Sequence, residues 1–213
     1  MVTCLLSEAT GFFMMNKTGF THIYNKIAPL YDLVFGRTCH DAYVLVLDVI
    51  EKYGLNFNSL LDVGCGTGTL LRFISDHMNV SELYGIDPSE NMIKIARKKK
   101  INRCQFYLES IENLSLPNSS IDYIVSTTAF SHFSDERNAL SQIHRALKET
   151  GLCIIVEHKK PKLYVERFLK RIKILANYRG YEEIKDIFVH TSFMILELRE
   201  TKKYIVAIIK PIK

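Results

Sequence analysis

The residues whose types and spacing best suit chemistry are one acid followed by three glycines at alternate positions: Asp62, Gly64, Gly66 and Gly68. The apolar residues before them are typical of a buried strand, and a helical pattern starts directly after them. Glycine lets the backbone turn sharply and approach a ligand closely, because no Cβ intervenes. The first turn of a helix also offers free N–H groups to a polar or anionic ligand group. We therefore predict that these four residues bind a cofactor.

A second acid, Asp87, follows another apolar stretch and precedes a second helical pattern. An acid at the end of the second strand of a nucleotide-binding fold accepts ribose hydroxyls of an adenosine cofactor. A dinucleotide loop has glycines at its first, third and sixth positions, whereas the sixth position here is Thr69. The spacing therefore disfavours an NAD-type oxidoreductase. Taken alone, Asp87 has a second interpretation as a helix-capping acid.

Two phrases of the sequence carry a family resemblance: D-x-G-x-G-x-G from Asp62, and G-I-D-P-S-x-x-M-I-x-x-A-R from Gly85. The first closely resembles motif I of the class I methyltransferases that depend on S-adenosylmethionine (SAM). The similarity is to the type 11, UbiE-like group of small-molecule and lipid methyltransferases, and it covers about residues 20–158. It implies that the glycine loop holds the amino-acid end of SAM, that Asp87 holds its ribose, and that S-adenosylhomocysteine is the product. An acid in this loop suits SAM, which carries an ammonium and a sulfonium.

The resemblance places the adenine contacts at Ser110 and Ile111, where family members usually have Asp-Ala. There the Asp accepts from the adenine amino group, and the next backbone N–H meets a ring nitrogen. Serine can still accept a hydrogen bond. Because the residue type differs from the family pattern, Glu109 is the alternative contact.

The sequence indicates the catalytic groups less clearly than the cofactor-binding residues. The three weak candidates are His132, Tyr24 and Tyr31. His132 comes after the fourth predicted strand and is a suitable base by type. An ordinary loop histidine is the alternative, because no carboxylate partner is identifiable. The aromatic faces of the two tyrosines would favour a cation, although half-buried anchors are the commoner role. The segment His22–Phe35 is similar to the N-terminal segment that lies over the cofactor in this family.

Two missing motifs narrow the methyl acceptor. The loop after the fourth strand reads Ser126-Thr127-Thr128-Ala129, not the Asn/Asp-Pro-Pro-aromatic motif of nucleobase amine methyltransferases. No proline precedes a cysteine, as the nucleophile of carbon-5 pyrimidine methyltransferases would require. We therefore predict methyl transfer by in-line displacement to a small-molecule or lipid-like acceptor. An RNA or protein methyltransferase and a non-catalytic SAM-binding partner subunit stay open as alternatives, and the acceptor atom and oligomeric state are undetermined.

Composition bounds the class of protein. With 213 residues, of which 47% are hydrophobic, one domain with a sizeable core is expected. No apolar run approaches the ~20 residues of a membrane span. The five cysteines show neither CxxC nor metal-ligand spacing, so we expect reduced thiols, no metal and a cytoplasmic location.

Positive charge is concentrated in one segment, Lys159–Lys173, which holds seven basic residues and one acidic residue. The rest of the chain is close to neutral, which argues against a specific nucleic-acid partner. Apolar residues at helical spacing within the segment predict a cap-like basic helix inserted at about 159–177. Two interpretations stay open: peripheral contact with an anionic membrane, or a cap helix whose lysines are solvated.

The elements needed to position these residues alternate along the chain. We predict strands over 59–63, 82–86, 104–108, 121–126 and 152–157, helices over 42–53, 69–77, 89–99, 135–147 and 181–188, and a closing hairpin of 193–198 and 204–209. Such βα alternation requires a parallel sheet covered on both faces. The expected fold is a Rossmann-like, doubly wound, seven-stranded α/β sheet, mostly parallel with an antiparallel last strand. Residues 1–20 form an N-terminal extension, for which disorder is one interpretation, and 21–213 a single methyltransferase domain.

Overall fold

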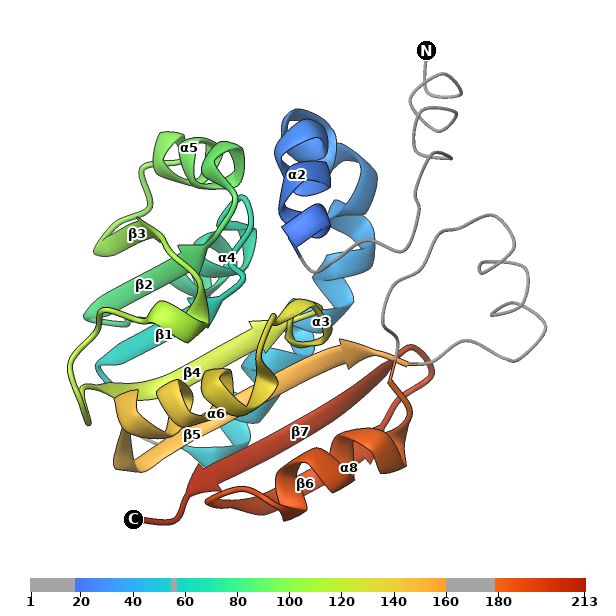
Figure 1. Ribbon diagram of the computed structural model, residues 1–213. Helices are drawn as coiled ribbons and strands as arrows, with labels where there is room; N and C mark the ends of the chain where they lie inside the picture. Colours follow the sequence, from blue (N-terminus) through green and yellow to red (C-terminus); the bar gives the residue numbers. More distant parts are fainter. Residues whose placement is uncertain (1–17, 55–56, 160–178) are drawn as a thin grey trace, which may run out of the picture.

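Within the part of the chain that the computed structural model describes, residues 18–54, 57–159 and 179–213, seven strands form one sheet (Figure 1). Their order is β3-β2-β1-β4-β5-β7-β6. The strands are β1 (Ser59–Val63), β2 (Glu82–Asp87), β3 (Cys104–Leu108), β4 (Ile121–Thr127), β5 (Leu147–His158), β6 (Phe193–Glu200) and β7 (Tyr204–Pro211). The predicted fold class is confirmed.

The first five strands pair in parallel, whereas β7 is inserted between β5 and β6 and is antiparallel to both. All five residues of β1 are buried, as expected for the centre of a sheet covered on both faces. The strand order reverses between β1 and its neighbour β4. In open α/β sheets this switch point leaves a crevice at the carboxyl ends of the strands, where ligands bind.

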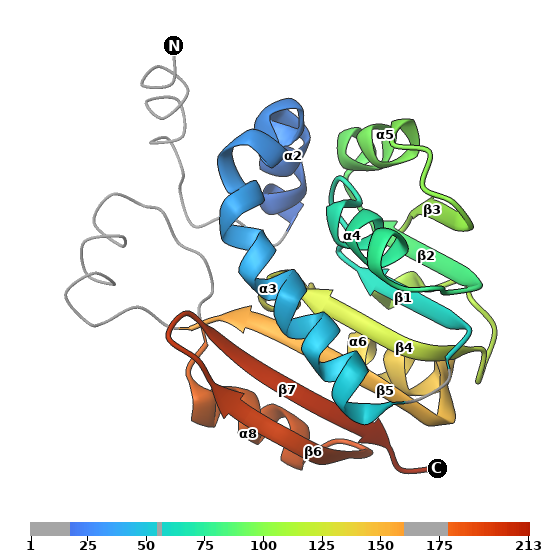
Figure 2. The ribbon, with the colours of Figure 1, turned by 180° about the vertical axis from the view of Figure 1, so that it is seen from behind.

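Helices cover both faces of the sheet and enclose two hydrophobic cores (Figures 1 and 2). One face carries α3 (Tyr31–Tyr53), α4 (Thr69–His77) and α5 (Glu90–Lys98). The other carries α6 (Glu136–Ala146) and α8 (Tyr181–Val189). Tyr123, fully buried on β4, belongs to the first core, and its neighbour Ile124 belongs to the second. Side chains alternate across a strand, so the central strands contribute to both cores.

The long helix α3 extends eleven residues further toward the N-terminus than the predicted 42–53. It begins directly after a 3₁₀ turn, η2 (Ala28–Leu30), and ends at Gly54, whose φ of 57° closes the helix in the left-handed region. Gly36 lies within the helix, where an added Cβ would meet nothing within 4 Å. Residues 31–41 were not predicted as helix because the apolar residues of the first turn lie on the side opposite the buried face.

Two further boundaries differ from expectation. Helix α2 (Thr18–Ile27) begins inside the range 1–20 assigned to the extension. Strand β5 begins at Leu147 rather than 152, because a register shift against β4 lets Leu147 pair with Ile121 ahead of the regular ladder. The predicted basic helix at 159–177 lies almost wholly outside the described residues. Among the helices in the described ranges, none has the length and apolarity to cross a membrane.

Candidate active site

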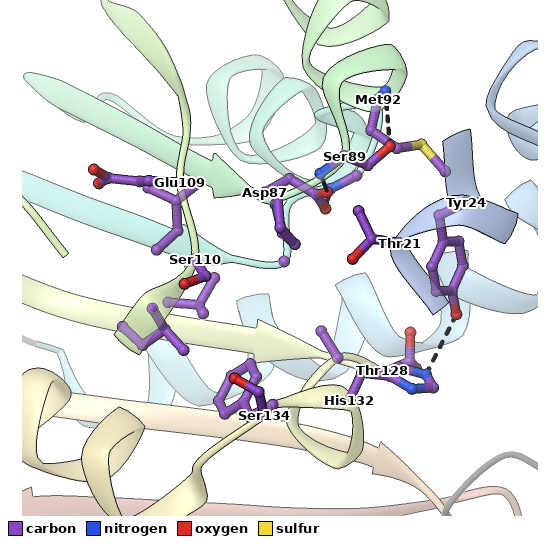
Figure 3. A pocket seen from close by; sticks show the side chains of 18 of the residues that line it. Thr21, Tyr24, Asp87, Ser89, Met92, Glu109, Ser110, Thr128, His132 and Ser134 are labelled. Atoms are coloured by element: carbon purple, nitrogen blue, oxygen red, sulfur yellow. Dashed lines mark hydrogen bonds between the residues drawn. The ribbon is translucent and has the colours of Figure 1, made fainter. Parts of the chain in front are cut away.

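A cavity of about 230 Å³ lies at the carboxyl ends of β1, β2 and β4, at the switch point of the sheet (Figure 3). One wall is formed by the loops after β1, β2 and β3. The opposite wall is formed by α2, the start of α3, and the loop after β4, which contains the 3₁₀ turn η4 (Phe130–His132). Of the predicted site residues, those that line the cavity are Gly64, Gly66, Asp87, Ser110, Ile111, Tyr24, Tyr31 and His132. Asp62 and Gly68 lie behind this lining.

The three glycines of the loop have positive φ, but they face different surroundings. A Cβ on Gly64 would lie 2.4 Å from the Ala129 Cβ, and one on Gly68 would lie 2.7 Å from the Phe106 ring. Gly68 therefore permits helix α4 to pack against the sheet rather than approach a ligand. Gly66 alone faces open space, with only the Met92 sulfur at 4.0 Å. This is the position where the backbone is bare toward the cavity.

The carboxylate of Asp87 ties the two loops of the cofactor wall together. Its Oδ2 accepts from the backbone N–H of Gly66 at 2.9 Å, and its Oδ1 accepts from that of Ser89 at 2.8 Å. Burial raises the pKa of Asp87 to about 6, and these two hydrogen bonds oppose the rise. Ser89 then caps helix α5 through its hydroxyl, which accepts from Met92 N–H. The capping seen here belongs to Ser89, and Asp87 is left oriented at the cavity edge.

Asp62 is 1% exposed, and its Oδ1 has no hydrogen-bond partner among the described residues. Burial, and then the charge of Asp87, raises the pKa of Asp62 to about 8. A buried carboxyl without full compensation is costly, and a cation bound nearby reduces that cost. Two buried carboxyls beside a bare glycine therefore fit a ligand that carries an ammonium and a sulfonium, as SAM does.

The residues predicted to contact adenine, Ser110 and Ile111 with Glu109 as the alternative, all line the cavity. Ser110 precedes the 3₁₀ turn η3 (Ile111–Asn113), and its hydroxyl accepts from the Asn113 side-chain amide at 3.4 Å. In Figure 3 the Glu109 carboxylate points away from Asp87, and its Oε1 accepts from the backbone N–H of Ser115. Both candidates for the adenine contact, Ser110 and Glu109, therefore line the cavity, and the Glu109 carboxylate is the one engaged with the Ser115 backbone.

The three weak catalytic candidates meet in one aromatic group on the opposite wall. The Tyr24 hydroxyl lies 3.3 Å from His132 Nε2, within hydrogen-bonding distance. The Tyr24 ring packs edge-on against Tyr31, with ring centroids 6.1 Å apart, and against His132 at 5.8 Å. Burial lowers the pKa of His132 to about 4 and raises that of Tyr31. His132 is therefore neutral at pH 7, and its lowered pKa makes it a weak base.

Sequence reasoning missed Glu157, which lies near the end of β5 and is 4% exposed. Its carboxylate accepts from the backbone N–H of Phe130 at 2.7 Å and from the Ser131 hydroxyl at 3.1 Å. It therefore fixes the turn that carries His132. Burial raises the pKa of Glu157 to about 7, and the bond from Phe130 opposes the rise. The available signal was the single acid at the end of the predicted strand 152–157, whose other residues are apolar.

Thr128 was also missed, and it lines the cavity with a φ of 54°. A β-branched residue in the left-handed region is strained, and such strain gathers at functional sites. Its backbone N–H donates to the Val156 carbonyl at 2.7 Å, which holds the loop after β4 against β5. No local sequence signal marks a threonine for this conformation.

Two polar side chains fasten the N-terminal helices over the cavity. Asn25 Oδ1 accepts from the Ser89 hydroxyl at 2.8 Å and from the Asn91 backbone N–H at 3.0 Å. Asp32 accepts from the Thr67 hydroxyl at 2.5 Å and from Lys99 Nζ at 2.8 Å. The segment that carries Tyr24 and Tyr31 is thus held to the cofactor loops. Within residues 18–54, 57–159 and 179–213, no group of three His, Cys, Asp or Glu could hold a metal ion.

Comparisons with known proteins agree with this geometry. Residues 61–155 match the Methyltransf_11 family model, described as a methyltransferase domain. The chain is 26% identical over 211 residues to the ubiquinone/menaquinone biosynthesis C-methyltransferase UbiE of Campylobacter jejuni, covering 87% of this chain and 89% of that one. It is 30% identical over 155 residues to the demethylmenaquinone methyltransferase of Thermotoga maritima, covering 70% and 65%.

A solved structure shows the same fold. The complex of DhpI with S-adenosylhomocysteine (SAH) superposes with a TM-score of 0.74 at 16% identity, covering 92% of this chain and 97% of that one. At 16% identity this structural similarity supports the fold alone. The family match and the relatives in sequence identify the chemistry, and they favour SAM over NAD as the cofactor. The chain belongs to the SAM-dependent methyltransferases of the Methyltransf_11 family.

Proposed function

We propose that this methyltransferase acts on a small, lipid-like acceptor, held between the aromatic group of Tyr24, Tyr31 and His132 and the cofactor loops. The observation that carries the proposal is the division of one cavity into two unlike walls. The cofactor wall presents Asp87 and the bare backbone of Gly66. The opposite wall presents aromatic rings and a neutral histidine. An apolar, ring-bearing acceptor fits the second wall better than a charged one.

Each wall has a separate task in the reaction. SAM, when bound, supplies a methyl group made electrophilic by its sulfonium. Asp87 would accept the ribose hydroxyls, and Ser110 with the Ile111 backbone would hold the adenine. The aromatic group would orient the acceptor for in-line attack, a positioning effect worth ~7–11 kcal/mol. His132 would take the acceptor's proton once the bound substrates raise its pKa, because at a pKa of about 4 it is a weak base.

The named relatives support this substrate class. Among the curated relatives, the Campylobacter jejuni and Thermotoga maritima proteins are named for ubiquinone, menaquinone or demethylmenaquinone chemistry. A Bacillus anthracis relative, 27% identical over 143 residues, is named as acting on malonyl-[acyl-carrier protein]. These names describe those proteins. For this chain they favour an acceptor with an apolar portion, and they leave the methylated atom open.

The experiment that tests the proposal offers methyl-labelled SAM and the full chain to a cell extract divided into lipid, small-molecule, RNA and protein fractions. Label in the lipid or small-molecule fraction, identified by mass, supports the proposal. Label confined to RNA or protein contradicts it in favour of a macromolecular substrate. SAM binding without label in any fraction identifies a non-catalytic partner subunit. The Gly66→Val variant serves as the blank.

We also propose that the protein makes peripheral contact with an anionic membrane, from which such an acceptor would be drawn. The sequence-based support is the basic segment Lys159–Lys173, most of which lies outside the described residues. The surface that the structure does describe provides a separate argument.

A further inference from the structure

An exposed apolar surface lies at the start of α3, and we call Leu30, Leu33 and Val34 the α3 ridge. Leu33 is 83% exposed, Val34 59% and Leu30 45%. The α2–α3 junction that carries the ridge and the helix α5 lie at the same end of the molecule in both views (Figures 1 and 2). Three large aliphatic side chains in five residues form a patch rather than scattered exposure, and such patches mark interaction sites.

The ridge points away from the protein. At 100° per residue, Leu30, Leu33 and Val34 share one side of α3, and the buried residues Cys39 and Tyr43 face the opposite side. Further along the helix the outward side is mostly polar: His40, Asp41, Asp48 and Glu51 are exposed, and Val44, 38% exposed, is the apolar residue among them. The core therefore gives no packing reason for the ridge. Among the described side chains of α3, the exposed apolar residues are concentrated in the first turn, next to the cavity.

The ridge is continuous with the acceptor wall of the cavity. Phe35, 39% exposed, follows the ridge by one residue, and its ring lies 5.0 Å from the Tyr31 ring. Tyr31 in turn contacts Tyr24, and both tyrosines line the cavity. Aromatic surface thus leads from the ridge to the place where the acceptor is proposed to bind.

Positive charge surrounds the ridge. Helix α5 packs against α2 and η2, and residues 18–36 and 90–100 together hold six basic and two acidic residues. Lys26, Lys98 and Lys100 are exposed. Both acids are neutralised by lysines: Asp32 pairs with Lys99 at 2.8 Å, and Glu90 pairs with Lys94 at 2.7 Å. The net charge available to a partner at this end is positive.

We propose that the α3 ridge docks on the surface of an anionic lipid bilayer and places the acceptor wall next to the lipid. Apolar side chains flanked by lysines match the boundary between acyl chains and anionic headgroups. A purely apolar protein partner would gain nothing from the lysines. The biological purpose of docking rests on the proposed lipid-like acceptor. The docking itself does not, because vesicle binding is measurable without any acceptor.

A fluorescent reporter tests the docking directly, since the chain contains no tryptophan. L33W puts a single tryptophan on the ridge, and M194W puts one at a 53% exposed position on the distant edge strand β6. With vesicles of phosphatidylglycerol and phosphatidylcholine, the emission of L33W shifts to the blue and is quenched by brominated lipid. M194W does not respond. The L33W response disappears with pure phosphatidylcholine and weakens as salt is added.

Ridge variants measure how much of the binding the surface supplies. L33S/V34S lowers the vesicle partition coefficient about tenfold or more, because two inserted aliphatic groups are lost. K98E/K100E lowers it by a similar factor at low salt. The control M194S changes it less than about twofold, since exposed substitutions have small effects. SAM affinity measured by calorimetry stays at the wild-type value in every variant, which shows that the fold is intact.

Three outcomes would overturn the inference: no response of L33W to anionic vesicles, an equal response of M194W, or loss of binding in R167E/K170E while L33S/V34S binds normally. The last result assigns the contact to the basic segment. Docking and substrate class fail separately. Vesicle binding through the ridge combined with label in RNA would leave the docking standing and remove the lipid-like acceptor. Label in lipid without vesicle binding would do the reverse.

Discussion

The two walls of the cavity are built in opposite ways. The cofactor wall comes from consecutive loops between β1 and η3, and backbone N–H groups fix its key carboxylate, Asp87. The acceptor wall brings together Tyr24 and His132, which are 108 residues apart. Side-chain bonds through Asn25 and Asp32 hold its N-terminal part in place. The cofactor wall is therefore built locally, whereas the acceptor wall depends on contacts between distant segments and on its bonds to the cofactor loops.

The largest expected effect tests the cofactor wall alone. Gly66→Val should abolish measurable SAM binding, because its side chain would fill the one place where the loop is bare toward the cavity. Gly66→Ala is the matched control, since it carries the cost of a φ of 52° with less volume. Calorimetry measures the loss of SAM binding, and thermal unfolding measures the loss of stability caused by backbone strain. Wild-type affinity in a folded Gly66→Val protein would remove Gly66 from the site.

The next effect tests the acceptor wall alone. His132→Ala should lower kcat for methyl transfer by about 100-fold, within the range for loss of a general base, and leave SAM affinity unchanged. Tyr24→Phe should cause a smaller loss of about tenfold, because it removes only the hydroxyl that lies 3.3 Å from the histidine. The exposed His190 provides a control variant, His190→Ala. A fall in SAM affinity in His132→Ala would show that the two walls are coupled.

A third prediction concerns Asp87 on the cofactor wall. Asp87→Ala should weaken SAM binding by roughly 1.5–3 kcal/mol, because hydrogen bonds to a charged group are lost. The same carboxylate gives the binding a pH dependence. Its pKa of about 6 means that affinity should fall as the pH is lowered through 6, because the protonated group accepts fewer hydrogen bonds. Titration calorimetry between pH 5 and 8 checks both points, with Asp48→Ala on the outer side of α3 as the control. Unchanged affinity in Asp87→Ala would refute the ribose assignment.

Glu157 gives the acceptor wall a pH signature of its own. Its pKa is raised from 4.5 to about 7, so the folded protein keeps a proton that the unfolded chain loses near pH 4.5. Its contribution to stability is therefore largest below pH 4.5 and is lost as the pH rises through 7. Glu157→Gln mimics the protonated form, so its stability relative to wild type should rise by about 1–3 kcal/mol between pH 5 and 8. Urea unfolding measures this change, and Glu149→Gln at an exposed site should show none.

The same contrast explains what the sequence could and could not predict. The alternation of strands and helices, the glycine loop and the position of Asp87 follow from short motifs and local periodicity, and the structure places them as expected. The roles of Gly68 and Glu157 depend on packing against Phe106 and on the turn at Phe130, which are far away in sequence. The start of α3, residues 31–41, was missed because the apolar residues of its first turn lie on the outer side. Local signals predicted the cofactor wall, whereas tertiary contacts decided the acceptor wall.

The smallest expected effect concerns the adenine contact, where this chain departs from the family pattern. Ser110 lines the cavity before η3, whereas the Glu109 carboxylate turns toward the Ser115 backbone. Ser110→Asp should therefore keep or strengthen SAM binding, by up to about fivefold, because a charged acceptor bonds more strongly than a hydroxyl. Glu109→Ala should change the affinity less than about twofold, as expected for a side chain outside the contact. If Glu109 has instead replaced the family's aspartate, the order of the two variants reverses. A crystal structure with SAH decides between them, and the absence of both side chains from the adenine amino group would exclude both. If neither variant changes the affinity by more than about twofold, Asp87 and the glycine loop supply most of the binding.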